Sequence, residues 1–300
     1  MNHLYKSTLA STLFDVFNAL FFVAFTALCI YPFWYMIVYS VSEPARAGSV
    51  LFWPEGFTLF NFEKVFALKG IGQAALISVL RTVIGTATTV FCCSFLGYLF
   101  SKKEMPLRTL LYRMLVITMY VSGGLIPTYL VYKGYGLMNN FLIYILPTAI
   151  SAYNVILIKT FIEQLPPSLE ESAMIDGAGY FRVFVSIVLP LSLPIIATIA
   201  VFASVAQWNS WFDNYIYITK NDSINTLQLL LYKLINEAER IARMIREGSI
   251  NDAANLAQQT LTPRGVQITV TVFATIPILL VYPFMQRYFV KGLMVGAIKG

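Results

Sequence analysis

The sequence predicts an all-α protein that crosses a membrane six times. Of its 300 residues, 58% are hydrophobic and only 12% are charged, whereas a soluble domain is about a quarter charged. The hydrophobic residues gather in runs that are long enough to cross a bilayer, which needs about 20 helical residues. These two observations predict a multi-pass membrane protein whose spans are helices.

Six runs are long enough to serve as spans. They cover residues 14–39, 75–100, 109–131, 141–161, 185–208 and 266–289. The short loop at 101–108 holds three Lys or Arg residues, whereas the loop at 132–140 holds one. The positive-inside rule therefore places the 101–108 loop, the 162–184 stretch and both termini in the cytoplasm. The long connections at 40–75 and 209–265 are then outside.

Small residues along the second span favour close helix packing in lipid. They are Ser78, Gly85, Thr86, Ala87, Thr88, Ser94 and Gly97. Gly123, Gly124 and Pro127 are expected to kink the third span. Arg81, near the outer end of the second span, is expected to reach the membrane interface rather than to line a path.

Two stretches of the outer connections have helical patterns of their own. Asn61 to Phe66 predicts a short surface helix. Thr226 to Ile245 alternates apolar and charged residues at helical spacing, which predicts an amphipathic helix.

The stretch 166–194 is a polar connection between two apolar spans, and it is patterned for helices. Ser168 followed three residues later by Glu171 is a capping box, which predicts a helix start. Asp176 and Gly177 predict its end or a bend. A second short helix should follow and run into the fifth span. A helix-turn-helix at a membrane face is suited to docking onto a partner.

The residue types present exclude several classes of site. No Gly-x-x-x-x-Gly-Lys-Ser/Thr loop occurs, so the chain should not hold ATP on a phosphate-binding loop. His3 is the only histidine, so no Ser/His/Asp or Cys/His catalytic set can form, and no spacing of metal ligands is seen. Cys29, Cys92 and Cys93 lie in apolar runs and are expected to be packing residues. No basic tract with interleaved aromatics predicts nucleic-acid binding.

Three patterns in the polar stretch resemble the cytoplasmic "EAA" signature of ABC-importer permeases. They are Glu171-Ser172-Ala173, Asp176-Gly177-Ala178, and Ile187-Val188-Leu189-Pro190 followed by Pro194. Ser172 departs from the family, which usually has alanine there, but serine is nearly isosteric and should pack as usual. The resemblance continues over nearly the whole chain.

Further stretches resemble the carbohydrate branch of that family, relatives of the inner-membrane subunits of the maltose importer. They are Trp208 to Phe212 and Tyr282 to Gly292. Ala75 to Arg81 and Ser101-Lys102-Lys103 resemble the subgroup of lipoprotein-associated and oligosaccharide or polysaccharide importers.

The resemblance implies a type I ABC-importer permease fold, with residues 1–300 forming one transmembrane domain in a bacterial-type cell membrane. It implies a second homologous permease chain, two ATP-binding subunits and an extracellular solute-binding protein. That protein would deliver a carbohydrate, expected to be an oligosaccharide. No cofactor is then expected in this chain, and it is not an enzyme, because the ATPase subunits would bind and hydrolyse ATP with Mg²⁺.

The resemblance also makes residues 166–184 the coupling helices, which sit in a groove of the ATPase. The residues expected to act there are Glu170, Glu171, Ala173, Asp176 and Gly177. The apolar residues Leu169, Ala173, Met174 and Ile175 are expected to form the buried contact. The sequence leaves open which acid touches the ATPase and which holds the helix together.

Three weaker expectations concern the tail, the outer connection and the sugar path. Lys291, Gly292 and Lys299 would enter the ATPase dimer, unless the tail is a frayed basic end. The 209–265 connection would reach the solute-binding protein, unless its amphipathic helix lies on the membrane. Possible stacking or polar contacts for sugar are Tyr120, Trp208, Asn209, Trp211 and Tyr215. Aromatic residues are also ordinary at membrane interfaces.

Two other functions compete with an importer subunit. A stand-alone channel or secondary carrier would transport without ATP, and a structural or assembly factor would not transport at all. Coupled carriers usually keep ionisable residues at mid-membrane. No Asp or Glu lies well inside any of the six predicted spans, which favours an energy source outside the membrane plane.

Overall fold

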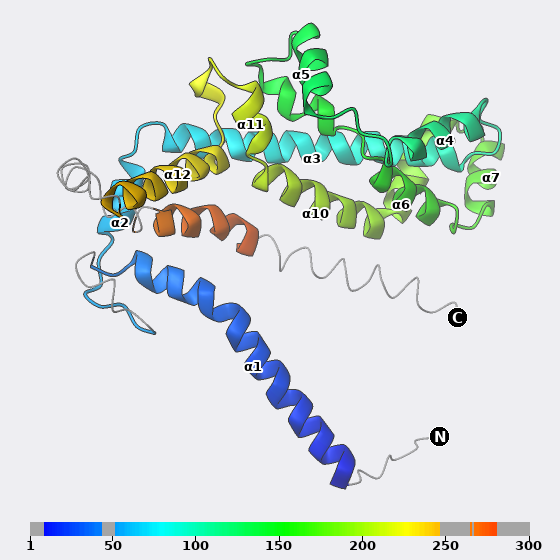
Figure 1. Cartoon of the computed structure of the whole chain (residues 1–300). Coiled ribbons are helices and arrows are strands. Elements are labelled where there is room, and N and C mark those ends of the chain that lie inside the picture. Colours follow the sequence, from blue (N-terminus) through cyan, green and yellow to red (C-terminus); the bar gives the residue numbers. More distant parts are fainter. Residues whose placement is uncertain (1–8, 44–51, 247–264, 266, 281–300) are drawn as a thin grey trace. The chain divides into compact units, whose positions relative to one another are not determined.

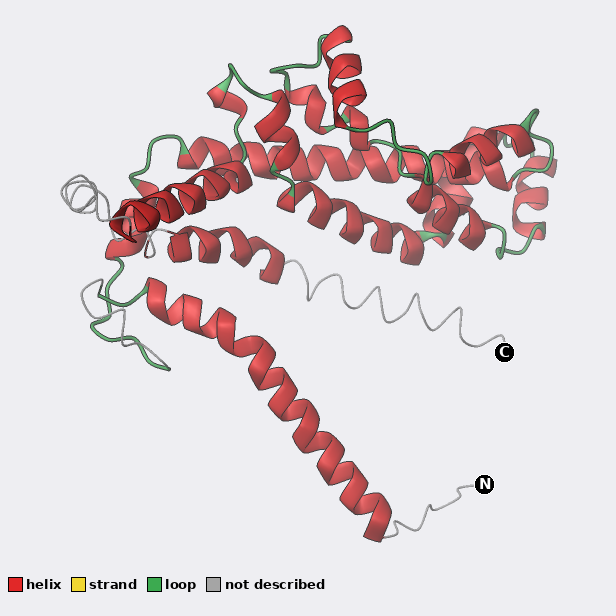
Figure 2. Ribbon diagram, in the orientation of Figure 1, coloured by secondary structure: helices red, strands yellow, loops and turns green. Residues whose placement is uncertain are grey.

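The computed structural model describes residues 9–43, 52–246, 265 and 267–280. Within these ranges every regular element is helical, and the only extended pairing is an isolated antiparallel bridge between Ser42 and Phe57 (Figures 1 and 2). The longer helices are α1 (Leu9–Ser40), α2 (Phe60–Phe66), α3 (Ile71–Ser101), α4 (Arg108–Ile117), α5 (Leu125–Gly134), α6 (Ala152–Ile162), α7 (Ser168–Ile175), α10 (Leu193–Asn209), α11 (Phe212–Tyr217), α12 (Leu227–Arg246) and a Gln267–Leu280 helix. The shorter ones are η1 (Phe141–Tyr144), η2 (Leu146–Thr148), α8 (Tyr180–Val183), η3 (Phe184–Val188), α9 (Leu189–Leu191) and η4 (Asp222–Ile224).

Two single helices in the described ranges are long and apolar enough to cross a membrane. They are the Ser11–Ser40 part of α1 and the whole of α3, which correspond to the first and second predicted spans. The short helix predicted at 61–66 and the amphipathic helix predicted at 226–245 are present as α2 and α12. Of the sixth predicted span, Gln267–Leu280 is an apolar helix, and residues 281–289 lie outside the described residues.

The third predicted span is not one continuous helix. It is divided into α4 and α5, each of 10 residues, so neither half reaches the ~20 residues that a bilayer needs. Gly124 has a φ of +80° directly before α5, a backbone conformation that glycine adopts readily. The predicted kink at the glycines is therefore confirmed, and it is a complete break.

The fourth and fifth predicted spans are bent pairs of helices. The Phe141–Thr148 and Ala152–Ile162 segments meet at 46°, and the Tyr180–Leu191 and Leu193–Asn209 segments meet at 83°. Pro190 lies at the start of α9 and Pro194 at the start of α10. Prolines have no backbone N–H and cannot continue a helical ladder. The fifth predicted span, 185–208, is therefore sharply bent between α9 and α10.

The described residues group into two compact units. One holds the described residues up to Leu68 and those between Leu234 and Phe273, and the other holds 69–233 and the described residues from Ala274. In the first unit, the Asn61 side chain donates to the carbonyls of Ser40 and Ser42 at 3.1 and 3.2 Å. These bonds join the start of α2 to the end of α1.

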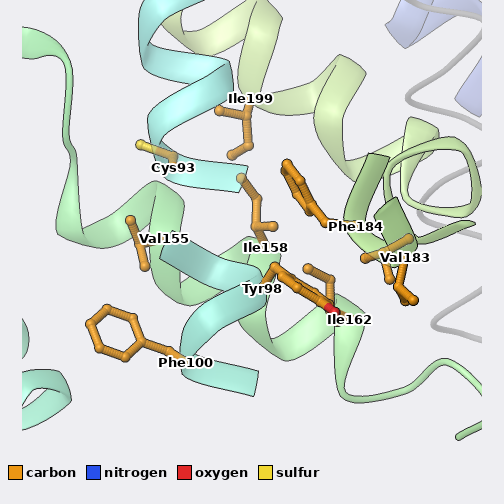
Figure 3. Packing of buried hydrophobic residues seen from close by; sticks show 10 residues of the cluster. Cys93, Tyr98, Phe100, Val155, Ile158, Ile162, Val183, Phe184 and Ile199 are labelled. Carbon is orange, nitrogen blue, oxygen red and sulfur yellow. The ribbon is translucent and has the colours of Figure 1, made fainter. Parts of the chain in front are cut away.

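The core of the second unit forms where α3 packs against α6 and α10, which run beside it in Figure 1. In Figure 3, Ile158 of α6 lies between Ile199 of α10 and Tyr98 of α3, and Phe184 faces the same space. The remaining buried members of this cluster are Cys93, Phe100, Val155, Ile162, Val183 and Val188. The core thus reaches from the membrane helices to the α8–η3 segment that follows α7.

Two glycines of α3 permit this packing. A Cβ atom on Gly97 would lie 2.9 Å from Cγ2 of Ile158 and 3.2 Å from the backbone nitrogen of Lys159. A Cβ atom on Gly85 would lie 2.5 Å from the side-chain nitrogen of Gln207. The predicted close packing by small residues is therefore confirmed at these two positions.

The Gly97 contact gives a stability prediction. Gly97→Ala should lower the apparent melting temperature of the detergent-purified chain, because the methyl group overpacks the α3–α6 contact at a cost of about 1–3 kcal/mol. Gly72→Ala is the matched control in the same helix, because nothing lies within 4 Å of the added methyl group. Equal melting temperatures for the two variants would contradict the packing.

Candidate functional site

The N-terminus of α7 is made by a proline and not by a capping box. The helix begins at Ser168, as predicted, but Pro167 precedes it with helical angles (φ −57°, ψ −31°) and no side chain caps it. The backbone N–H groups of Glu170 and Glu171 donate to the Pro167 carbonyl at 3.0 and 3.1 Å. Proline fixes φ near −65° and so favours a helix start. The predicted Ser168–Glu171 box is therefore wrong.

The C-terminus of α7 is a Schellman motif. The N–H of Ala178 donates to the Ala173 carbonyl at 2.9 Å, and that of Gly177 donates to the Met174 carbonyl at 3.0 Å. Gly177 has a φ of +83°, which this motif requires and glycine adopts without a Cβ penalty. The predicted stop at Asp176 and Gly177 is confirmed.

One face of α7 is bound to its own chain. Glu170 forms an ion pair with Lys102, which directly follows α3. The Lys102 ammonium also lies 4.5 Å from the centre of the Tyr98 ring. Ala173 and Met174 pack against the hydrophobic core. These contacts join α7 to the end of α3, so Glu170 and Ala173 have structural roles within the chain.

The other face of α7 is exposed. Ile175 is 86% exposed and Leu169 is 42% exposed, and Glu171 and Asp176 are also exposed. The expectation that Leu169 and Ile175 form a buried contact with a partner stays a prediction, because both are accessible in this chain. An isoleucine this exposed beside two carboxylates forms a small mixed surface that a partner can cover.

Further ion pairs fix the segments next to α7 to one another. Glu163 pairs with Arg108 at 2.9 Å and with Lys159 at 2.7 Å. The Arg108 Nε atom donates to the Phe100 carbonyl at 2.6 Å. Because Arg108 starts α4 and Glu163 follows α6, these contacts hold the ends of α3, α4 and α6 together beside α7.

Arg81 lies at the centre of a buried network near the other end of α3. It is 1% exposed, so the expected position at the membrane interface is wrong. Its guanidinium forms a two-pronged ion pair with Asp213, one bond of which is 3.1 Å long. It also donates to Gln207 Oε1 at 2.9 Å and to the Ser210 carbonyl at 3.2 Å.

The surroundings of this network neutralise its charge and fix its geometry. The Arg81 guanidinium lies 4.5 Å from the centre of the Tyr144 ring. Gln207 donates in turn to the Tyr144 carbonyl at 3.2 Å and to the Thr148 hydroxyl at 2.7 Å. A bidentate Arg–carboxylate pair with satisfied neighbours is the arrangement that tolerates burial.

The sequence did not indicate this network. Its residues bond to partners that are far away in the sequence. Arg81 is 132 positions from Asp213 and 126 from Gln207, and Gln207 is 63 positions from Tyr144. The only available signal was an arginine within an apolar run, which requires a partner if it is buried.

The residues expected along a sugar path do not form one site. Trp208 is buried, and its Nε1 donates to the Ala274 carbonyl at 2.9 Å. Trp211 stacks on Tyr232 at 3.9 Å between ring centres, and Tyr215 packs beside both rings. Asn209 is exposed at the end of α10, and Tyr120 is 83% exposed between α4 and α5. Trp208 is thus a structural residue, while the others have accessible surface.

The remaining expected site residues lie outside the described residues. They are Lys291, Gly292 and Lys299 of the tail. In the described ranges no group of three or more His, Cys, Asp or Glu residues could hold a metal ion.

Comparisons with known proteins agree with this architecture. No protein-family model matches the chain. It is 38% identical over 301 residues to protein LplC of Bacillus subtilis (strain 168), covering 99% of each chain. It is 38% identical over 292 residues to the polygalacturonan/rhamnogalacturonan transport system permease protein YtcP of the same organism, covering 96% of this chain and 99% of YtcP.

One solved structure is similar over almost the full length. It is a chain of a bacterial ABC transporter involved in the import of the acidic polysaccharide alginate. The TM-score is 0.81 at 25% identity, and the match covers 94% of this chain and 98% of that chain.

The Arg81–Asp213 pair gives a second stability prediction. Asp213→Asn should destabilise the detergent-purified chain by about 2–4 kcal/mol, because it leaves a buried guanidinium without its counter-charge. The control is Arg240→Ala, which removes an ion pair with Glu237 whose side chains are 57% and 48% exposed. That change should leave the melting temperature unaltered. An Asp213→Asn variant as stable as the wild type would show that the pair is not needed.

Proposed function

We propose a working mechanism for this chain as a permease subunit of a carbohydrate ABC transporter. It belongs to that family, because it is 38% identical to LplC and to YtcP over almost its full length. The family predicted from the sequence is thereby confirmed, and the chain is an integral membrane protein. In our proposal it forms one domain that crosses a bacterial-type cell membrane six times, with both termini in the cytoplasm. It shares one translocation path with a second homologous permease chain.

The proposed substrate is an oligosaccharide that an extracellular solute-binding protein delivers. YtcP is a polygalacturonan/rhamnogalacturonan transport permease, and the structural relative belongs to a transporter involved in alginate import. These relatives support a substrate of several linked sugars. The 209–265 connection, which includes α12, would meet the solute-binding protein. Tyr120, Asn209, Trp211 and Tyr215 stay proposed contacts along the path.

The proposed source of energy is a pair of ATP-binding subunits, which would hold ATP and Mg²⁺. The chain itself would hold no cofactor, because its sequence has no phosphate-binding loop. Lys291, Gly292 and Lys299 of the tail would enter the ATPase dimer.

The coupling part of this proposal rests on the difference between the two faces of α7, one exposed and the other in contact with the core. The exposed face, with Glu171, Ile175 and Asp176, would sit in the ATPase groove. The opposite face, with Glu170 and Ala173, holds α7 to α3 and to the core. We therefore propose that Glu171 and Asp176 meet the partner, whereas Glu170 holds the helix.

This arrangement would convert movement of the ATPase into movement of the spans. In this proposal α7 moves together with the core helices that it contacts, because an ion pair, apolar packing and the Schellman turn at Gly177 hold it to them. Closure of the ATPase dimer around ATP would then shift the path from inward-open to outward-open, and hydrolysis would return it.

The function is tested with the complete importer in proteoliposomes. Its solute-binding protein is first screened against a panel of mono- and oligosaccharides by calorimetry. Uptake of the best ligand should require ATP, both permease chains, the ATPase subunits and the solute-binding protein. ATP-independent uptake by the purified single chain would instead identify a stand-alone carrier, and no uptake by an ATP-hydrolysing complex would indicate an assembly role.

Gly177→Pro should separate ATP hydrolysis from uptake in that assay. Proline cannot adopt the φ of +83° found at this position, so the turn after α7 must change. We expect at least a tenfold loss of sugar imported per ATP hydrolysed, with normal amounts of protein in the membrane. Gly136→Pro is the matched control, because Gly136 also has a positive φ (+68°) but lies outside α7 and its contacts. Wild-type uptake and stimulated hydrolysis in Gly177→Pro would contradict coupling through this turn.

A further inference from the structure

A short loop of the outer connection, residues 219–225, is held in place by contacts from other parts of the chain. It follows α11 and precedes α12 (Figure 1), and it includes η4. Its exposed residues are all polar: Thr219, Lys220, Asp222 and Ser223. In the proposed topology the loop lies outside the membrane, as does the 132–140 turn. The contacts that hold it join residues of the second unit, so they lie within one compact body.

Asn139, in the 132–140 turn, fixes the first half of the loop. Its Oδ1 atom accepts from the backbone N–H groups of Thr219 and Lys220 at 2.8 and 2.7 Å. Its own N–H donates to the Tyr217 carbonyl at 3.1 Å, and its carbonyl accepts from the Asn221 side-chain amide at 3.4 Å. Through these bonds a single residue joins two outer segments that are far apart in the sequence.

The backbone of Asn139 is adapted to this role. It has a φ of +56°, in the left-handed region that asparagine enters more readily than most residues other than glycine. Such a conformation persists only where the surrounding structure determines it. Here the bonds to the loop do so, which indicates that the side chain and the backbone of Asn139 act together to hold the loop.

Two further side chains fix the second half of the loop. The Nε2 atom of Gln73, in the first turn of α3, donates to the Ser223 carbonyl at 2.7 Å. The hydroxyl group of Tyr144, in η1, donates to the Ile224 carbonyl at 2.9 Å. The loop is therefore held in both halves. A surface that is already ordered loses little conformational entropy when a partner binds, which suits it to docking.

The charge of these outer segments favours an acidic protein as the partner. Lys220 of the loop and Lys133 of α5 are exposed, and neither forms an ion pair with another described residue. Asp222 is the only acid of the loop, and its Oδ1 already accepts from the Asn225 amide at 2.8 Å. Free positive charges steer an acidic partner toward a surface. A lipid surface would be met by apolar side chains, and the loop exposes none.

We infer that Asn139 is a positioning residue, which holds the 219–225 loop in the geometry that receives an acidic patch of the solute-binding protein. The inference rests on the proposed function, in which the 209–265 connection meets that protein. It names the part of the connection that makes the contact. It also assigns a role in docking to a residue of the 132–140 turn, which lies outside that connection.

The test measures uptake by the complete importer in proteoliposomes against the concentration of sugar-loaded solute-binding protein. Asn139→Gly should raise the half-saturating concentration about tenfold, the scale expected for the loss of two hydrogen bonds, whereas uptake at saturation should stay near that of the wild type. Glycine keeps the positive φ, so only the side-chain bonds are removed. Asn139→Asp should retain wild-type values, because a carboxylate oxygen accepts the same two bonds.

A charge change tests the surface separately from the fold. Lys220→Glu keeps the backbone N–H that bonds to Asn139. It should raise the half-saturating concentration, and more so at low than at high ionic strength. Asn140→Ala is the matched control, because the Asn140 side chain accepts from the Leu142 N–H of its own turn at 3.0 Å and makes no bond to the loop. That variant should behave as the wild type.

The outcomes separate this inference from the proposed function. If wild-type uptake does not require the solute-binding protein, the proposed import fails, and the inference fails with it. If uptake requires that protein but Asn139→Gly and Lys220→Glu leave the half-saturating concentration unchanged, the import stands and the docking loop is wrong. If Asn139→Gly lowers only the melting temperature or the saturated uptake, the residue stabilises the fold and the positioning role is overturned. If Lys220→Glu instead raises the KM for sugar at saturating binding protein, the loop contacts the sugar, which also overturns the inference.

Discussion

The close packing of α3 against α6 and α10 is the constraint on which the rest of the second unit depends. It requires glycine at position 97, where any side chain would meet Ile158, and at position 85, where it would meet Gln207. The position of Gln207 in turn sets the Arg81 network, and the position of Ile158 sets the core that receives α7. Small residues are the general means by which membrane helices approach closely. Here they also decide where the polar side chains of the neighbouring helices can lie.

The helix α3 connects the Arg81 network to α7. Arg81 near one end bonds to the segment from Gln207 to Asp213, and Lys102 at the other end bonds to Glu170 of α7. Arg81 and Lys102 are 21 positions apart, about 30 Å at 1.5 Å per helical residue. In the proposed mechanism a movement of α7 is therefore passed along a continuous helix to the Arg81 network.

The sequence predicted those features that depend on local pattern. The runs of α1 and α3, the amphipathic α12, and the α7 helix with its glycine turn all follow from composition and spacing within one segment. It did not predict what depends on distant contacts. Arg81 was expected at the interface because it lies near the outer end of the second predicted span. Its partner Asp213 is 132 positions away in the sequence. The breaks at Gly124 and Ser192 were underestimated, because glycine and proline permit a bend but the packing of neighbouring helices sets its size.

The central claim is that the exposed face of α7 contacts an ATP-binding subunit. A photo-reactive benzoylphenylalanine placed at Ile175 in the purified complete importer tests it directly. The control has the same group at Tyr135, which is 78% exposed and directly follows α5. We predict a covalent product between this chain and an ATP-binding subunit from position 175 and none from position 135. An importer that retains ATP-driven uptake, yet gives no such product from position 175, would contradict the account.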